Sequence, residues 1–123
     1  MANSAKNQIT KEKADLHDVI MPLLRAMYKE FTEFSKKNPR DALSAKKVKM
    51  VNRVLESCSK ILESEPSRQY LDLLEDDDAT LQNSDVIIIL SQYVAAMEQF
   101  KLKYYNDDTL DPFDTIDGRW LTK

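Results

Sequence analysis

Residues 85–105, DVIIILSQYVAAMEQFKLKYY, decide the fold class of this chain. Apolar side chains return at steps of three or four residues, at Val86, Leu90, Tyr93, Met97, Phe100 and Tyr104. This spacing places them on one face of an α-helix, which has to bury that face against other elements. Asn83, Ser84 and Asp85 are the candidate N-caps. The helix is expected to end near Asn106, a residue that tolerates the left-handed conformation.

Two earlier segments have the same period, which predicts two more long helices. In the segment that ends at about residue 37, the apolar positions are Leu16, Ile20, Leu23, Leu24, Met27, Phe31 and Phe34. In the segment that ends at about residue 63, they are Val48, Val51, Val54, Leu55, Cys58, Ile61 and Leu62. Thr10 is the expected N-cap of the first of these helices, because its hydroxyl can accept from an amide of the first turn.

Prolines and capping residues set the expected helix boundaries. Pro22 has no amide to donate and its ring crowds the carbonyl of Asp18, so it predicts a kink or two helices in sequence. We favour the kink, because the apolar stripe keeps its phase across Pro22. Asn38 is the expected cap of the second helix, with Pro39 at its first position. Ser44 is the rival cap, but a start there puts three lysines near the positive end of the helix dipole.

The C-terminal residues are not expected to be helical. Residues 107–123 alternate aspartates with large apolar side chains and contain both Pro112 and Gly118. Because both residues interrupt helices, we expect an irregular acidic-aromatic tail. A shorter helix is predicted at residues 67–75, followed by a solvated acidic loop at 75–78.

The predicted fold is all-α, a small antiparallel helix bundle. It has three long helices, the first kinked at Pro22, one short helix and an irregular acidic C-terminal tail. Residues 9–106 form the bundle domain, residues 1–8 a disordered N-terminus and residues 107–123 the tail. A length of 123 residues fits one such domain.

Glycine and cysteine usage agrees with this class. Gly118 is the only glycine, whereas sheet proteins of this size need several for tight hairpin turns. Cys58 is the only cysteine, so no internal disulfide can form. The longest purely aliphatic run is residues 86–90, against about 20 residues for a membrane-spanning helix. The first fifteen residues lack the apolar run of a secretory signal. We therefore expect a cytoplasmic protein with no membrane partner.

The net charge of −3 conceals two oppositely charged halves. Residues 1–61 hold 13 Lys and Arg against 7 Asp and Glu, whereas residues 62–123 hold 5 against 14. One interpretation is that oppositely charged helices lie side by side and neutralise each other in part. The other is a polarised molecule with one basic and one acidic binding face.

No set of residues predicts catalysis, a metal site or a cofactor. The only histidine, His17, follows an apolar position of its helix and is expected at the surface or at its boundary. Cys58 falls in an apolar stripe, where a thiol behaves as a small hydrophobic group. One His and one Cys do not make a structural zinc site, and neither aspartate cluster fits a calcium loop. A chain with one glycine has no phosphate-cradling loop. The remaining enzyme alternative is a carboxylate-based site.

Nucleic-acid binding has one candidate cluster. The basic 36–53 cluster surrounds the connection between the first two long helices and comprises Lys36, Lys37, Arg40, Lys46, Lys47, Lys49 and Arg53. Such residues contact phosphates, and Lys46, Lys47, Lys49 and Arg53 are the candidate contacts. The isoelectric point of about 5.2 and the lack of a recognised motif argue against this use. A solvated face that pairs with the acidic loop is the simpler explanation.

The tail is the segment that most suggests contact with another protein. Its candidate contact residues are Asp111, Phe113, Asp114, Ile116 and Trp120. Acidic residues keep such a segment in solution, while the apolar ones can enter a partner's groove. The alternative is that the large apolar residues cover the open end of the bundle.

We therefore expect a non-enzymatic interaction module, such as a small subunit, adaptor or inhibitor. It would act on a basic partner protein through its acidic face and tail, with nucleic-acid binding as the alternative. An apolar stripe wider than the core needs would add a groove or a homodimer interface. The aromatic and methionine residues of the last helix are one candidate for that surplus, although core packing explains them equally well.

Overall fold

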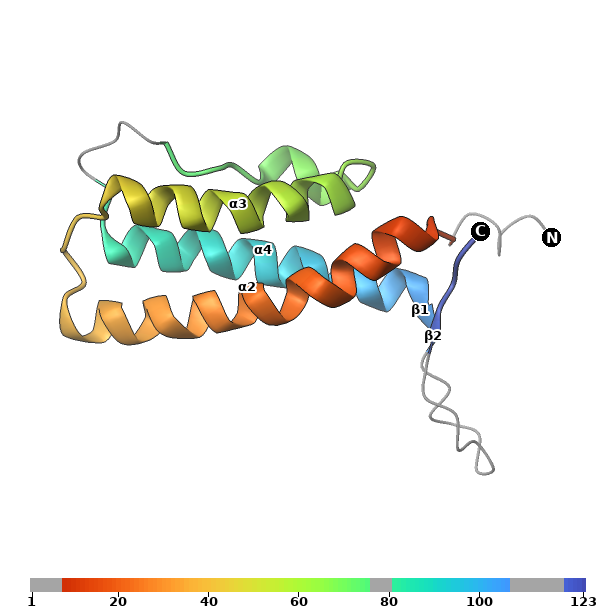
Figure 1. Ribbon diagram of the computed structural model, residues 1–123, viewed down its shortest axis with the longest axis horizontal. Coiled ribbons are helices and arrows are strands. Elements are labelled where there is room, and N and C mark those ends of the chain that lie inside the picture. Colours follow the sequence, from red (N-terminus) through yellow and green to blue (C-terminus); the bar gives the residue numbers. More distant parts are fainter. Residues whose placement is uncertain (1–7, 76–80, 107–118) are drawn as a thin grey trace, which may run out of the picture.

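Three long helices that pack against one another make up most of this chain (Figure 1). The computed structural model describes residues 8–75, 81–106 and 119–123. Its elements are α2 (Lys11–Lys37), α3 (Ala45–Ile61), the 3₁₀ helix η1 (Pro66–Tyr70), α4 (Asn83–Tyr104), β1 (Tyr105–Asn106) and β2 (Arg119–Trp120). The mostly helical prediction is confirmed, and a short antiparallel strand pair, β1–β2, adds to it.

The core lies where α2 packs against both α3 and α4. In Figure 1, α3 runs alongside α4, and the N-terminal half of α2 crosses in front of α4. Every apolar position predicted for α3 is buried, and so are the six positions predicted for α4. Tyr93, Met97, Phe100 and Tyr104 are therefore core residues, and they supply no apolar surplus on α4.

The predicted stripe of α2 is rotated from the face that the helix buries. The buried residues of α2 are Ala14, His17, Ile20, Met21, Leu24 and Phe31. Leu23 and Phe34, both predicted as core, remain 52% and 38% exposed. The helix runs unbroken through Pro22, so the alternative of two helices in sequence is wrong.

The N-caps of the first two long helices are hydroxyl side chains. The Thr10 hydroxyl accepts from the Lys13 amide at 3.2 Å, as predicted. The Ser44 hydroxyl accepts from the Lys47 amide at 3.2 Å, so Ser44 is the cap of α3 and the preference for Asn38 is wrong. Asn38 instead ends α2, where its amide donates to the Phe34 carbonyl at 2.7 Å.

Backbone pairing keeps the connection between α2 and α3 from becoming helical. The Leu43 amide donates to the Leu81 carbonyl at 3.1 Å, and the Asn83 amide donates to the Asp41 carbonyl at 3.0 Å. Because these groups are bonded to the segment that enters α4, they cannot form the turns of a longer α3. Three lysines consequently stand in the first two turns of α3, despite the helix dipole.

The helix α4 begins one residue earlier than the predicted caps. Gln82 is the N-cap, and its amide donates to Asp85 Oδ2 at 2.9 Å. Asn83, one of the predicted caps, is buried inside the helix and donates its side-chain amide to the Asn38 carbonyl at 2.9 Å. The start of α4 is thus fixed by the same connection that ends α2.

The segment that follows α3 is only partly helical. The prediction of a helix over 67–75 is wrong beyond Tyr70, where η1 ends. The Asn52 side chain pairs with both backbone groups of Leu74, at 2.8 Å each, and the Tyr93 hydroxyl donates to the Asp72 carbonyl at 3.1 Å. Side chains from α3 and α4 thus hold residues 71–75 in a non-helical conformation.

The two ends of the chain meet beside the C-terminus of α4. The Ile9 amide donates to the Leu121 carbonyl at 3.0 Å, and the Lys123 amide donates to the Ile9 carbonyl at 2.9 Å. The register of β1 and β2 pairs Tyr105 with Trp120. Residues 1–7, residues 76–78 of the predicted acidic loop and residues 107–118 of the predicted tail lie outside the described residues.

Candidate functional site

An apolar groove runs between α2 and α3 and has a volume of about 330 Å³. We call it the α2–α3 groove. Its lining comprises Leu23, Ala26, Met27, Glu30, Phe31 and Phe34 on α2 with Lys47, Met50, Val51 and Val54 on α3. Two of its largest apolar side chains, Leu23 and Met50, are 52% and 54% exposed. The groove is thus an apolar surface that the fold leaves uncovered.

The groove exists because α2 carries more apolar surface than its core needs. Leu23 and Phe34 belong to the stripe predicted from the sequence, but the helix turns a neighbouring stripe inward. Corresponding side chains of the two stripes are about one residue apart in the sequence, which is about 100° around the helix axis. The surplus apolar surface of this groove therefore lies on α2 and α3, whereas the exposed apolar residues of α4, Ile88 and Leu102, lie outside the groove lining.

Opposite charges stand on the two sides of the α2–α3 groove. Glu30 belongs to the α2 side and Lys47 to the α3 side. The Lys47 ammonium lies 4.7 Å from the centroid of the Phe34 ring, a cation–π contact across the end of the groove. Neither Glu30 nor Lys47 is in an ion pair within the residues that the structure describes.

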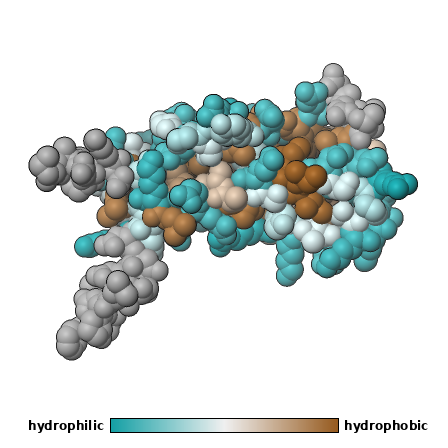
Figure 2. Space-filling view, turned by 180° about the vertical axis from the view of Figure 1, so that it is seen from behind, coloured by the Kyte–Doolittle hydropathy of each residue, from teal (hydrophilic) through white to brown (hydrophobic). Residues whose placement is uncertain are grey.

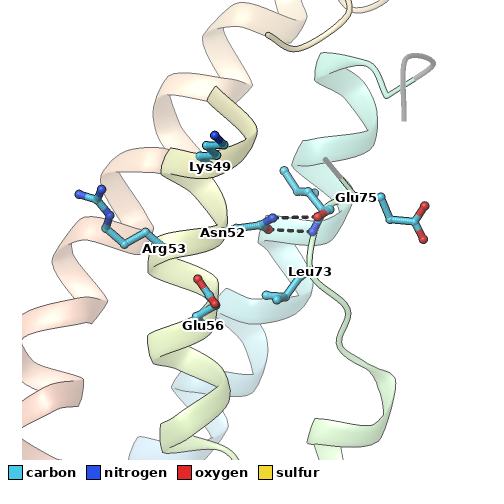
Figure 3. Close-up of a pocket in the computed structure, with 7 residues that line it drawn as sticks. Lys49, Asn52, Arg53, Glu56, Leu73 and Glu75 are labelled. Carbon is cyan, nitrogen blue, oxygen red and sulfur yellow. Dashed lines mark hydrogen bonds between the residues drawn. The ribbon is translucent and has the colours of Figure 1, made fainter. Parts of the chain in front are cut away.

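A second, more polar groove of about 610 Å³ lies between α3 and the segment 71–75. Figure 3 shows Asn52 pointing at this segment, with its two hydrogen bonds to Leu74, while Arg53 and Glu75 point away on opposite sides. Because these charged groups do not converge, they form no acid–base pair for catalysis. The two Asn52 hydrogen bonds join α3 to this segment, so the second groove has a structural role.

The four basic residues considered for nucleic acid face two sides of α3. Lys47 lines the α2–α3 groove, whereas Lys49 and Arg53 line the groove beside residues 71–75. All four, Lys46 included, are exposed and belong to no ion pair in the described parts of the chain. Lys46, Lys49 and Arg53 are spaced to share one exposed side of the helix, and Lys47 lies apart from them over the Phe34 ring.

Of the predicted tail residues, the structure describes only Trp120. Asp111, Phe113, Asp114 and Ile116 lie outside the described residues. Trp120 is half-buried, and its indole Nε1 donates to Asp18 Oδ1 at 3.0 Å. Its ring lies 4.9 Å from that of His17, measured between centroids, in a T-shaped arrangement. This placement fits the alternative in which Trp120 covers the end of the bundle.

His17 is buried, contrary to its predicted surface position. It is 1% exposed, its Nε2 lies 2.9 Å from the Met97 carbonyl oxygen, and its ring stacks on Phe100. Burial lowers the pKa of His17, and the charge of Lys101 lowers it further, while the Met97 contact opposes both effects. Its spacing from Met21 and Leu24, both buried, was the signal that could have placed it in the core.

Other titratable groups of the core serve structural roles. The Glu65 carboxylate accepts from the Tyr104 hydroxyl at 2.8 Å and from the Lys103 ammonium at 3.3 Å. Burial raises the pKa of Tyr104, and the neighbouring Glu65 carboxylate adds to this rise. Burial also raises the pKa of Cys58 to about 12, so its thiol stays protonated and unreactive near neutral pH.

The described part of the chain offers no metal-binding or membrane-spanning feature. Within residues 8–75, 81–106 and 119–123, no three His, Cys, Asp or Glu side chains are grouped to hold a metal ion. Among the same residues, no helix combines the length and apolarity needed to cross a bilayer. Comparisons with protein-family models, with curated proteins and with solved structures found no match to this chain.

Proposed function

We propose that this chain is a non-enzymatic protein-binding module, such as a small subunit, adaptor or inhibitor. The observation that carries the proposal is the α2–α3 groove, whose exposed Leu23 and Met50 form a concave apolar surface. Exposed apolar grooves of this kind receive side chains of a partner protein. The lining holds one carboxylate, Glu30, and one ammonium, Lys47, and the described residues include no cluster of three metal ligands, so binding accounts for the groove better than catalysis does.

The acidic tail is proposed as a second contact with a basic partner protein in the cytoplasm. Its aspartates and large apolar residues, Asp111, Phe113, Asp114 and Ile116, support this role through sequence alone. Trp120 is not assigned to partner binding, because its indole donates a hydrogen bond to Asp18 of the same chain. We also retain the proposal that α2 bends at Pro22, since that residue has no amide to complete the helical ladder.

Nucleic-acid binding receives less support. Lys46, Lys49 and Arg53 are spaced to share an exposed face of α3, but Lys47 is turned toward Phe34. Glu56 and Glu75 line the same groove as Lys49 and Arg53, so phosphates would meet both signs of charge there.

Site-specific cross-linking tests the proposed function. A photo-reactive amino acid replaces Met50 in the groove of the full chain, which is expressed in its native cells. The control carries the same group in place of Ile88 on α4, which is 59% exposed and lies outside the groove lining. We expect discrete protein adducts from position 50 that position 88 does not give. Equal labelling from both positions, or none from position 50, would reject the proposal.

A second pair of variants tests the tail. Phe113→Ala combined with Ile116→Ala removes two apolar anchors and leaves residues 119–123 in place. A truncation after residue 106 would instead remove the segment that bonds to Ile9 and Tyr104. We expect the double variant to lose position-50 adducts if tail and groove hold one partner. Unchanged adducts would remove the tail from the proposal.

A further inference from the structure

The α2–α3 groove has two sides of different charge, and this restricts what can occupy it. On the α2 side, Glu30 is the carboxylate in the lining. Glu33, one turn further along α2, is already paired with Lys36 of the same helix at 3.4 Å. On the α3 side, Lys47 is the basic residue in the lining, while Arg53 lines the other groove, beside residues 71–75. An occupant therefore needs a basic group above α2 and an acidic group above α3.

We propose that the occupant is a second copy of this chain, which docks its own α2–α3 face to form a symmetric dimer. The helices α2 and α3 run antiparallel, joined by residues 38–44 (Figure 1). A two-fold axis parallel to this helix pair lays α2 of one copy over α3 of the other. Each Glu30 then faces Lys47 of the second copy. A two-fold axis across the helix pair would instead set α2 against α2 and bring the two acidic sides together.

The apolar surface of the face is suited to the same arrangement. Val19, Leu23 and Ala26 follow one another along the exposed side of α2 at steps of four and three residues, and Val19 is 61% exposed. This spacing is that of the seam in four-helix bundles. With α2 and α3 from each copy, the dimer forms a four-helix layer that covers Leu23 and Met50, which the single chain leaves exposed.

Exposed apolar residues elsewhere lack this combination. The view from behind in Figure 2 shows apolar patches separated by hydrophilic side chains. Ile88 on α4 and Tyr70 on η1 are 59% and 74% exposed, yet neither lines the α2–α3 groove. Ile88 therefore provides a control of matched exposure for Met50.

The mass of the purified full chain in solution tests this inference. By sedimentation at about 0.1 mM, we expect a species of twice the 14.3 kDa chain mass. Met50→Glu places a charge in the interface and should raise the dimer dissociation constant at least about tenfold, whereas Ile88→Glu should leave it unchanged. Circular dichroism establishes that each variant is folded before its mass is compared. A monomeric wild type, or a dimer equally sensitive to both substitutions, overturns the proposal.

Charge reversal tests the orientation of the two copies. Glu30→Lys alone and Lys47→Glu alone each place like charges opposite one another and should weaken the dimer. In an equimolar mixture of the two variants, the lysine introduced at position 30 of one chain faces the glutamate introduced at position 47 of the other. The second contact of that mixed dimer keeps the native pair of Lys47 and Glu30.

We expect the mixture to recover the dimer, a result that misfolding of either variant cannot imitate. Failure of the mixture to associate more strongly than its components overturns the proposed arrangement.

This inference rests on the proposed function, because both assign the α2–α3 groove to protein binding. Their failures are distinguishable. A monomeric chain whose position 50 cross-links to a different protein leaves the proposed function standing and overturns the dimer. A chain that gives no adduct from position 50 removes the proposed function as well.

Discussion

The indole Nε1 of Trp120 donates a hydrogen bond of 3.0 Å to the Asp18 carboxylate, which joins the last described segment to the first helix. The Trp120 ring also lies 5.4 Å from that of Tyr105 and 6.0 Å from that of Phe100, measured between centroids. The indole is thus held by Asp18, Tyr105 and Phe100, three residues that come close to it only in the folded chain. Its contribution to stability can be divided between the hydrogen bond and the ring packing.

Removing the hydrogen bond should cost less than removing the ring. We expect Trp120→Phe to lower the free energy of unfolding by about 1 kcal/mol, because the ring contacts remain. Trp120→Ala should lower it by about 2 kcal/mol or more, since the packing of a half-buried aromatic is also lost. Urea denaturation followed by circular dichroism measures both.

Asp18 provides the matched control for the same contact. Asp18→Asn keeps an acceptor oxygen and should leave stability nearly unchanged, while Asp18→Ala should cost about as much as Trp120→Phe. In the Trp120→Phe background, Asp18→Ala should have no further effect. Additive losses in the double variant would show that the two side chains do not act through this bond.

Stability should fall as the pH falls through the range of an ordinary histidine. Burial lowers the pKa of His17 in the folded chain below its usual 6.5, and Lys101 and Arg25 act in the same direction while Asp18 opposes them. The unfolded chain therefore binds a proton before the folded chain does. The contribution of neutral His17 to the free energy of unfolding is fully present above pH 6.5 and is lost as the pH falls from there toward the lowered pKa. Urea midpoints at a series of pH values measure this decline.

His17→Gln is the control for the pH dependence. Glutamine has a side-chain N–H that can donate to the Met97 carbonyl, but it does not titrate. Because His17 is the only histidine, the variant should lose the part of the dependence that begins at about pH 6.5. An unchanged pH profile in the variant would assign the effect to carboxylates instead.

Asn52→Ala should destabilise the fold through its effect on residues 71–75. The substitution leaves the amide and carbonyl of Leu74 without their two 2.8 Å partners. For two part-buried hydrogen bonds we expect a loss of about 1 to 3 kcal/mol, measured by chemical denaturation. Arg53→Ala, at an exposed neighbouring position, should change stability by about 0.5 kcal/mol or less. Equal effects of the two substitutions would contradict the role given to Asn52.

Cys58 should react with a thiol reagent only when the chain unfolds. Its side chain is fully buried, and its pKa of about 12 keeps it protonated. We expect almost no modification by an aromatic disulfide reagent in buffer and complete modification in denaturant. The destabilised Asn52→Ala chain should react faster than the wild type in buffer. Rapid reaction of the native wild type would show that α3 opens locally at this site.

The sequence predicts the buried residues of α3 and α4 well, because every position that the helical period singles out in them is buried. In α2, two stripes about one residue apart are both rich in apolar side chains, and the period alone does not say which faces the core. The polar His17 made the correct stripe look less apolar, although its Nε2 contact with Met97 allows its burial. Part of the stripe that the period favours is left exposed in the groove. The residues and charges of the site are therefore visible in the sequence, but their exposure is not.

The remaining errors concern contacts between distant residues. Local electrostatics favours Asn38 as the cap, yet backbone bonds from Asp41 and Leu43 to the start of α4 decide the boundary. The helix predicted over residues 67–75 has suitable local composition, but Asn52 and Tyr93 bind its backbone in another conformation. In both cases, the residues whose hydrogen bonds decide the structure lie far from the affected segment in the sequence.

The bonds that join Ile9 to Leu121 and Lys123 give the fold a mechanical property. Ile9 and Thr122 form a parallel bridge, so tension applied to residues 9 and 123 in outward directions loads these bonds together in shear. Bonds loaded in this way resist as a group and do not open one after another. A force that enters through residues 9 and 123 would load these hydrogen bonds first, so the helices would carry little of the force until the bonds broke.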